Sequence, residues 1–360
     1  MQSMGKVRQR WDVFCQVIDN WGDIGVSWRL ATHLAQRGQR VRLWIDEPEA
    51  LAWMAPQGPD GVEVRRWTTP IDMTDLTPGD VLVEAFGCEI PEEFITEYVR
   101  HLGASPARWF NLEYLSAQNY AARCHGLPSP VSVGAGKGLV KRFCYPGFTA
   151  QTGGLLHEDD LLPKLERFDR AAWFDQQGIA WHPSQTVWSL FCYATAPVRS
   201  WLDALSQSGQ RTLVLVTDGI AARLVREALA HGHGASDSLH VYYLQRLSQQ
   251  EFDHLLWSSD GNVVRGEDSL VRAIWAGKPM LWQAYPQEDG AHHAKLHAVL
   301  DAIGAPPLMR AVHAWWNGST PALPGIAWND WPAWLPTMRR ARSTLLALDD
   351  LTDTLLRWAA

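Results

Sequence analysis

The stretch of residues 262–295, NVVRGEDSLVRAIWAGKPMLWQAYPQEDGAHHAK, constrains the fold of this chain more than any other part of it. It opens with a short apolar run and turns out of that run at Arg265 and Gly266. The next segment, SLVRAIWAG, has apolar residues at helical spacing and ends in Gly277, the usual place for a glycine at a helix C-terminus. A proline and a second apolar run follow. The stretch therefore predicts a strand–turn–helix–strand unit, the repeat of a parallel sheet covered by helices.

The turn of this unit is a candidate anion-binding site. The predicted helix begins at Glu267, Asp268 and Ser269, where backbone N–H groups lack partners within the helix and the positive end of its dipole lies. Such a turn suits a diphosphate, and Arg265 adds a cation. The alternative is that the three residues only cap the helix. A second loop, YPQEDGAHH, follows the next strand at the same edge of the sheet, which favours a ligand site.

Length and composition predict two globular domains in a reducing compartment. The chain has 360 residues, more than one domain usually holds, and no apolar segment approaches the roughly 20 residues of a membrane helix. The N-terminal apolar run is short and stops at Asp19, which indicates a first strand rather than a signal peptide. Five cysteines without a CxxC pair predict buried thiols and a cytoplasmic location. A net charge of −7 without a basic stripe argues against nucleic acid as a partner.

A second candidate site follows the first predicted strand, residues 12–18. The loop 19–25, DNWGDIG, contains two glycines and the carboxylates Asp19 and Asp23, and a helix is predicted over 26–36. The dinucleotide pattern GxGxxG is absent, and a carboxylate at the helix start would repel a pyrophosphate. Asp23 fits a helix N-cap and a contact to a cationic or proton-donating ligand about equally well. Asp19 fits better as a residue that holds the loop through its own backbone.

Strands alternate with helices through both halves of the chain, which predicts doubly wound parallel sheets. The further predicted strands are 41–45, 62–67, 81–85, 108–112, 187–193, 212–217 and 239–244, and the further predicted helices are 91–101, 197–207, 220–230, 248–257, 291–303 and 338–359. Residues 113–159 are rich in Gly, Pro and Ser and predict a long functional loop region. His293 and His297 have a spacing that can bind a metal, but no third ligand is evident, so a partly solvated helix face is favoured.

Two Rossmann-like domains, a carboxylate loop and a late diphosphate turn together indicate a GT-B glycosyltransferase, with the two domains facing across a cleft. The sequence resembles the EarP family, the bacterial protein-arginine rhamnosyltransferases that modify elongation factor P, over nearly its whole length. The resemblance rests on the blocks FCQVIDNWGDIGVSWRLA, NLEYLSAQNY, CHGLPSP, KRFCYPGFTAQTGGLL and VVRGEDSLVRAIWAGKPMLWQ. Trp21 and Cys144 stand where the family often has other large or aromatic residues. We expect an acceptor-side domain over 1–170, to which 341–360 returns, and a nucleotide-sugar domain over 171–340.

The resemblance implies an inverting, metal-independent transfer of L-rhamnose from dTDP-β-L-rhamnose to an arginine of elongation factor P, without a cofactor. The implied catalytic residues are Asp23, Asp19 and Glu267. The implied donor-binding residues are Asn20, Gly22, Phe191, Tyr193, Gln249, Phe252, Arg265, Gly266, Glu267, Asp268 and Ser269. Asp23 would be the base, and Asp19 would organise the loop or contact the acceptor. The Glu267 carboxylate would bind sugar hydroxyls or hold the turn, because it would repel a diphosphate.

For the thymine base, the resemblance implies stacking on Phe191 and Phe252, with Tyr193 nearby and Gln249 at the base edge. The alternative for both phenylalanines is an ordinary place in the core. Two other functions stay open from the residues alone. One is another GT-B enzyme, such as a heptosyl- or N-acetylglucosaminyltransferase or a nucleotide-sugar epimerase, against which only NLEYLSAQNY and CHGLPSP argue. The other is a non-catalytic module that binds a sugar nucleotide or a protein.

Overall fold

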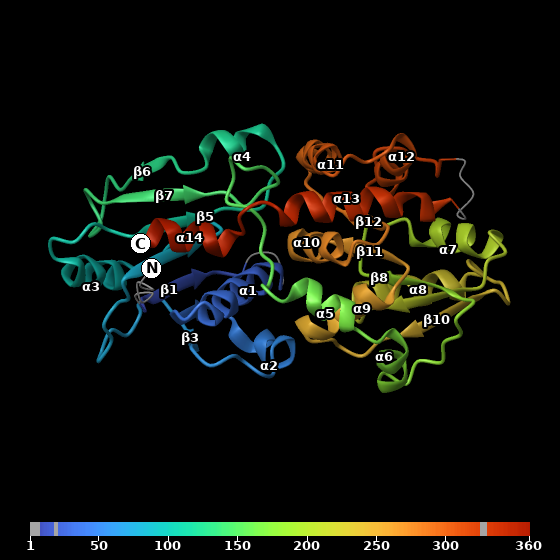
Figure 1. Ribbon diagram of the computed structural model, residues 1–360, viewed down its shortest axis with the longest axis horizontal. Helices are drawn as coiled ribbons and strands as arrows, with labels where there is room; N and C mark the ends of the chain where they lie inside the picture. Colours follow the sequence, from blue (N-terminus) through green and yellow to red (C-terminus); the bar gives the residue numbers. More distant parts are fainter. Residues whose placement is uncertain (1–7, 18–20, 325–329) are drawn as a thin grey trace, which may run out of the picture. The chain divides into compact units, whose positions relative to one another are not determined.

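The computed structural model describes residues 8–17, 21–324 and 330–360 (Figure 1). It divides into two compact units: a first unit of Met1–Glu158 and Leu348–Ala360, and a second unit of Asp159–Ala347. The expected boundaries at 170/171 and 340/341 therefore differ from the observed ones. The chain returns to the first unit at Leu348 rather than at residue 341, because the helix Leu335–Leu346 still packs within the second unit.

The first unit is built on a seven-stranded sheet in the order β3-β2-β1-β4-β5-β7-β6. Its strands are β1 (Arg10–Cys15), β2 (Arg40–Ile45), β3 (Val62–Arg66), β4 (Val81–Ala85), β5 (Trp109–Leu112), β6 (Pro128–Pro130) and β7 (Val140–Cys144). Its helices are α1 (Gly22–Gln36), η1 (Pro48–Ala50), α2 (Leu51–Met54), α3 (Glu92–Leu102), α4 (Asn119–Cys124) and α14 (Leu351–Ala359). The described strands pair in parallel except β6 and β7, which are antiparallel. The predicted doubly wound sheet is confirmed.

The region 113–159 is more regular than the sequence indicated. It contains α4, β6 and β7, and β7 pairs in parallel with β5. The expectation of a continuous loop region was therefore wrong. The sequence of β7, VKRFC, places charged and half-exposed side chains along most of the strand. Because only Cys144 of this strand is buried, it lacks the apolar run by which the other strands were found.

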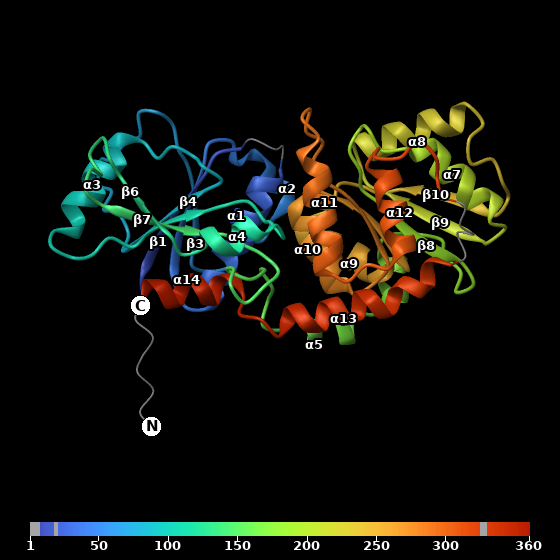
Figure 2. The ribbon, with the colours of Figure 1, turned by 90° about the horizontal axis from the view of Figure 1, so that it is seen from above.

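The core of the first unit lies on both faces of this sheet, because side chains alternate along each strand. Trp11, Val13 and Cys15 of β1 pack with α1 and α14 on one face. Phe14 packs with Trp44 of β2 and with α3 on the other. Figure 2 shows α14, in red, along the strands of this unit.

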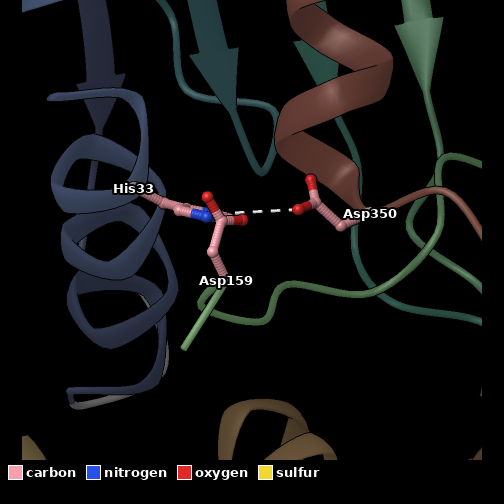
Figure 3. A group of neighbouring side chains, drawn as sticks. All are labelled: His33, Asp159 and Asp350. Carbon is pink, nitrogen blue, oxygen red and sulfur yellow. Dashed lines mark ion pairs between the residues drawn. The ribbon is translucent and has the colours of Figure 1, made fainter. Parts of the chain in front are cut away.

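The last predicted helix, 338–359, is two helices in the structure. α13 (Leu335–Leu346) ends in the second unit, and α14 begins after the N-cap Asp350, whose carboxylate accepts the N–H of Asp353 at 2.7 Å. The same carboxylate lies 3.9 Å from Nδ1 of His33 on α1 (Figure 3). Burial raises the pKa of Asp350. These contacts attach α14 to α1 inside the first unit.

The second unit has a five-stranded parallel sheet in the order β10-β9-β8-β11-β12. Its strands are β8 (Thr186–Leu190), β9 (Thr212–Val216), β10 (Leu239–Tyr243), β11 (Gly261–Arg265) and β12 (Met280–Gln283). Its helices are α5 (Leu161–Arg167), α6 (Arg170–Gln176), α7 (Val198–Gln207), α8 (Ile220–Ala230), α9 (Gln249–Ser258), α10 (Glu267–Ala276), α11 (Ala291–Ala302), α12 (Pro307–Trp316), η2 (Trp331–Trp334) and α13. Helices α5, α6 and α12 were not predicted from the sequence.

The missed helix α12 protects the outer edge of the sheet at β12. Nε2 of His313 accepts the N–H of Trp282 at 3.1 Å, and Nδ1 of His313 donates to the carbonyl of Met309 at 2.8 Å. Asn317 donates to the carbonyl of Trp282 and accepts the N–H of Ala284, both at 2.9 Å. Unpaired backbone N–H and C=O groups at the edge of a sheet can pair with another chain. The hydrogen bonds from His313 and Asn317 satisfy such groups on β12 and the residue after it.

Each sheet reverses its strand order beside its first strand. The reversal lies between β1 and β4 in the first unit and between β8 and β11 in the second. Connections leave a doubly wound sheet in opposite directions at such a point, and the carboxyl ends of the strands there bind ligands. The predicted carboxylate loop follows β1, and the predicted anion-binding turn follows β11. The topology therefore puts each candidate site at the reversal of its own sheet.

The cysteines are free, and four of the five are buried, as the sequence predicted. Burial raises the pKa of the Cys192 thiol to about 12. None of the helices within the described ranges combines the length and the apolar character needed to span a membrane.

Candidate active site

The turn between β11 and α10 has the predicted strand–turn–helix geometry, and Gly266 is the N-cap of the helix. Its φ of 69° and ψ of −170° belong to a region that is essentially restricted to glycine. A Cβ at this position would lie 3.1 Å from the hydroxyl of Tyr193. The indole of Trp282 donates to the carbonyl of Gly266 at 2.8 Å. Because Gly266 occupies the cap, the alternative that Glu267, Asp268 and Ser269 form the cap is wrong.

The guanidinium of Arg265 lies over two aromatic rings at this turn. Its Cζ lies 4.5 Å from the ring centroid of Phe191 and 4.4 Å from that of Tyr193. The negative faces of the rings attract the cation. Nη1 of Arg265 is buried and has no hydrogen-bond acceptor among the described residues. A buried, oriented guanidinium N–H without an acceptor can donate to a bound oxyanion.

Glu267 is paired with a cation that the sequence analysis missed. Nζ of Lys295, on α11, forms an ion pair with Oε1 of Glu267, and both side chains are largely buried. The pair neutralises the carboxylate that would otherwise repel an anion at the turn. The hydroxyl of Ser269 donates to the carbonyl of Arg265. Asp268, which is half-buried, completes the first turn of α10.

The predicted base-binding aromatics lie beside Arg265. Phe191 directly follows β8, and its ring meets that of Phe252, on α9, edge to face at 5.5 Å. Both rings are half-buried, and Phe252 also packs against a core cluster of this unit. Gln249 is the first residue of α9, after the N-cap Ser248, whose hydroxyl accepts the N–H of Glu251 at 3.2 Å. The structure therefore brings Phe191, Phe252 and Arg265 together, while the assigned ligand contacts stay predictions.

The last residue of β12, Gln283, and Tyr285 in the loop after it complete the surroundings of Tyr193 and were missed. Oε1 of Gln283 accepts the N–H of Tyr193 at 2.8 Å, and its Nε2 donates to the hydroxyl of Thr195 at 3.0 Å. The exposed ring of Tyr285 meets that of Tyr193 edge to face at 5.4 Å. The signal for both lay in the loop YPQEDGAHH and the strand before it, which were expected at this edge. Gln283 thus positions the segment that carries Tyr193.

In the first unit, Asp23 lies inside a helix and not in a loop. α1 begins at Gly22, four residues before the predicted start at Val26, and the N–H of Gly25 donates to the carbonyl of Trp21 at 2.9 Å. The N-cap is Trp21, so the interpretation of Asp23 as the N-cap is wrong. The side chain of Asp23 is buried in the first turn, where the helix dipole stabilises its charge.

Asp23 lies close to the carboxyl end of β1. The pKa of Cys15, the last residue of that strand, is raised to about 12 by burial, and the nearby charge of Asp23 adds to this rise. Asp23 therefore lies at the reversal of the first sheet. Asp19 and Asn20, which the sequence analysis assigned to the same site, lie outside the described residues. Gly22 is exposed at the start of α1.

Further carboxylates lie on the strands next to this site and were missed. Glu113 directly follows β5, is half-buried, and has a pKa raised by burial and by the charge of Glu84. Glu84, on β4, also has a raised pKa through burial, although Lys141 pairs with it at 2.8 Å. Glu113 stands in the block NLEYLSAQNY, which was the available signal. This end of the first sheet is therefore acidic.

The histidines with metal-like spacing form part of an exposed helix face. His297 is exposed, and Nδ1 of the half-buried His293 is 2.7 Å from the hydroxyl of Ser319. The prediction of a partly solvated face is confirmed.

Comparison with known proteins identifies the family. The sequence profile of the Elongation-Factor P (EF-P) rhamnosyltransferase EarP matches residues 11–360. The chain belongs to the EarP family. A protein-arginine rhamnosyltransferase of Pseudomonas putida is 42% identical over 314 residues, covering 82% of this chain and 81% of the relative. One of Pseudomonas aeruginosa is 40% identical over 359 residues, covering 92% of both chains.

Solved structures place the EarP-family chain among GT-B glycosyltransferases, as predicted. A structure described as the basis for EarP-mediated arginine glycosylation of translation elongation factor EF-P has a TM-score of 0.64 and 29% identity. It covers 97% of this chain and 98% of the solved one. A UDP-glucosyltransferase from Polygonum tinctorium has a TM-score of 0.52 at 11% identity and covers 99% of this chain and all of its own. This second likeness concerns the fold alone.

Proposed function

We propose that this protein is an inverting glycosyltransferase that moves L-rhamnose from dTDP-β-L-rhamnose to an arginine side chain of elongation factor P. Membership of the EarP family supports the reaction class. The observation that carries the donor half is the guanidinium of Arg265, which lies over the rings of Phe191 and Tyr193 and has a buried N–H that lacks an acceptor among the described residues. Such a group at the start of a helix suits a diphosphate.

In the donor half, Arg265 and the first amides of α10 bind the diphosphate and meet the charge that grows on it as it leaves. Lys295 neutralises Glu267, so that this carboxylate can accept hydrogen bonds from the sugar hydroxyls. Phe191 already has the Arg265 guanidinium on its ring. We therefore assign the stacking of thymine mainly to Phe252, with Gln249 at the base edge.

In the acceptor half, Asp23 is the base. An arginine guanidinium is a weak nucleophile, because its pKa exceeds about 12 and its lone pairs are delocalised. The buried carboxylate orients one N–H and takes up its proton as the C–N bond forms. The bond between the anomeric carbon and the diphosphate oxygen breaks in the same step, dTDP leaves, and the anomeric configuration inverts.

The proposed reaction uses no metal and no cofactor. A cation and oriented backbone dipoles at the anion-binding turn supply the positive charge that a divalent ion supplies in other enzymes. The acceptor arginine and the sugar nucleotide are the only reactants of the proposed reaction.

The test is the intact mass of unmodified elongation factor P after incubation with the protein and dTDP-β-L-rhamnose. We expect a gain of one deoxyhexosyl group, located on an arginine by peptide mapping. UDP-glucose, UDP-N-acetylglucosamine and ADP-heptose serve as competing donors. Transfer from one of these in place of dTDP-rhamnose would favour another GT-B enzyme. Tight binding of elongation factor P or dTDP without any turnover would favour a binding module.

A further inference from the structure

One face of β1, β2 and β3 carries a cluster of arginines, two of which, Arg10 and Arg40, are the first residues of their strands. Arg10 and Arg40 are register partners on neighbouring parallel strands, and Arg42 and Arg65 follow at alternate positions of β2 and β3. Side chains at alternate positions point to one face, so these arginines share a face of the sheet. They are far apart in sequence, which explains why no basic stripe was visible there.

Helix α3 and residues of the connection β3–β4 cover only part of this face, where they pack on Phe14 and Trp44. The connections β1–β2, β2–β3 and β4–β5 contain helices, whereas the connection β3–β4, residues 67–80, contains none. Parallel sheets are usually covered on both faces. The uncovered part is hollow: one cavity of about 470 Å³ and another of about 260 Å³ are both lined by Arg8, Arg10, Arg40 and Thr77.

The wall of the hollow is held rigidly. Arg42 is bound by the buried carboxylate of Asp12, with Nε to Oδ1 and Nη2 to Oδ2 both at 2.7 Å, and it also donates to the carbonyl of Thr77 at 2.8 Å. The N–H of Gly79 donates to Oδ2 of Asp12 at 2.6 Å. A Cβ at Gly79 would overlap the carbonyl oxygen of Arg10. The loop 75–80 is therefore pressed against β1 and cannot fill the space.

Arg8, Arg10 and Arg40 lack carboxylate partners in the hollow. Arg42 is neutralised by Asp12, and Arg65 is paired with Glu63 at 2.6 Å. For the other three guanidiniums, no carboxylate lies within ion-pairing distance in the part of the chain that the structure describes. Three acidic residues also line the hollow: Glu63 and Asp75 in the larger cavity, and in the smaller one Asp80, whose Oδ2 accepts the backbone N–H of Arg10 at 2.8 Å. In the smaller cavity, three arginines thus face one carboxylate.

The placement of Arg10 beside Arg40 costs free energy in the empty protein. Like charges on directly neighbouring strands repel, and strands lie about 4.8 Å apart. A multiply charged anion between the two guanidiniums would remove this repulsion. Arginine forks match the oxygens of a phosphate group in geometry as well as in charge.

We propose that this hollow is a second anion site, which binds a small, multiply charged phosphate ligand through Arg8, Arg10 and Arg40. It lies at the amino ends of the strands, whereas Asp23 lies at the carboxyl end of β1. The inference is independent of the proposed function. The concave, local shape suits a small ligand, since nucleic acid needs an extended basic track and the chain has a net charge of −7.

The experiment is calorimetric titration of the full chain with inorganic pyrophosphate. The background is Arg265→Ala, so that the anion-binding turn of the second unit contributes little. In this background, Arg10→Gln with Arg40→Gln is compared with Arg66→Gln and Arg223→Gln, exposed arginines that remove the same charge away from the hollow. We expect the first pair to weaken pyrophosphate binding at least about tenfold and the second pair to leave it unchanged.

Equal affinity in both double variants, or no binding in the background protein, would overturn the proposal. The proposal would also be overturned if a single-stranded RNA oligonucleotide bound in a way that requires Arg10 and Arg40, while pyrophosphate binding did not require them. Thermal unfolding without ligand checks the fold, and the first pair should unfold at the same or a higher temperature, because the repulsion is gone. Should that pair fail to fold, Arg8→Gln gives the same test, since its exposed side chain precedes β1. Undiminished binding by Arg8→Gln would then overturn the proposal.

Discussion

The two sheets place opposite charges at the same topological position. In the first unit, the reversal between β1 and β4 has the buried carboxylate of Asp23 in the first turn of the following helix. In the second unit, the reversal between β8 and β11 has the guanidinium of Arg265 just before the following helix. The strand order thus determines where each candidate site lies. The charge of the side chain there, Asp23 or Arg265, determines whether the site suits a cation or an anion. A guanidinium acceptor fits the first charge, and a diphosphate donor fits the second.

The largest effect should come from removing the carboxylate of the first unit. We expect Asp23→Asn to lower the transfer rate by about 10²–10⁴-fold, because the amide keeps the shape but loses the proton affinity. Affinity for dTDP should stay largely unchanged, since the groups assigned to the diphosphate and the base belong to the second unit. Initial rates from intact mass and calorimetry with dTDP measure the two quantities, with the exposed Asp60→Asn as control. A rate within a few fold of the wild type would remove the catalytic role of Asp23.

The converse change removes the cation of the second unit. We expect Arg265→Ala to weaken dTDP binding by about 1.5–3 kcal/mol, the usual contribution of a charge-assisted hydrogen bond. Binding of elongation factor P should not change. Calorimetric titration of each ligand tests this, and Arg223→Ala, an exposed arginine on α8, is the matched control. Unchanged dTDP affinity together with lost protein affinity would reverse the assignment of donor and acceptor to the two units.

Acid should weaken the second unit through His313. Burial lowers the pKa of His313 to about 4. Protonation of its Nε2 would also break the hydrogen bond that this atom accepts from the N–H of Trp282. The unfolded state binds that proton below about pH 6.5, so this stabilisation is complete above pH 6.5 and is lost as the pH falls towards 4.

The expected loss is on the order of a few kcal/mol, measured by urea unfolding across this range. His125, in the first unit, also has a pKa lowered to about 4 by burial, but it is half-exposed and should contribute less. His313→Gln should flatten the pH dependence, whereas His231→Gln, at the exposed end of α8, should not. An unaltered slope in His313→Gln would show that other groups govern the acid sensitivity.

The smallest expected effect is that of metal removal. If Arg265 and the amides of α10 neutralise the diphosphate, transfer should continue at the same rate in excess EDTA. A parallel assay with added magnesium or manganese should show no increase. If EDTA abolished activity and magnesium or manganese restored it, Arg265 and the amides of α10 would not be sufficient to neutralise the diphosphate.

Much of the fold could be predicted because its signals are local. The turn at Gly266, the helix after it and the glycine that ends it lie within a few residues of one another, and each was placed correctly. The start of α1 was misplaced because two glycines in the segment GDIG suggested a loop. The strand β7 was missed because its side chains are mostly charged or half-exposed, and α12 lay in a segment rich in proline and tryptophan.

The partners of the site residues could not be predicted in the same way. Lys295 pairs with Glu267 across two helices, and Gln283 holds the segment of Tyr193 from another strand. Such contacts depend on how side chains meet after the sheet has formed. The register of Arg10 with Arg40 is a further example. Sequence reasoning therefore named the residues at each sheet end but not the groups that neutralise or position them.

The return of α14 to the first unit has a consequence for how the protein is made. Leu351 and Leu355 of this helix belong to the same core as Trp11 of β1. The second unit, in contrast, is one continuous segment, Asp159–Ala347. During synthesis the second unit can finish folding first, and the first unit must wait for α14 to leave the ribosome. The part of the chain that is translated earliest is thus the last to be completed, and until then the apolar side chains that α14 covers stay exposed.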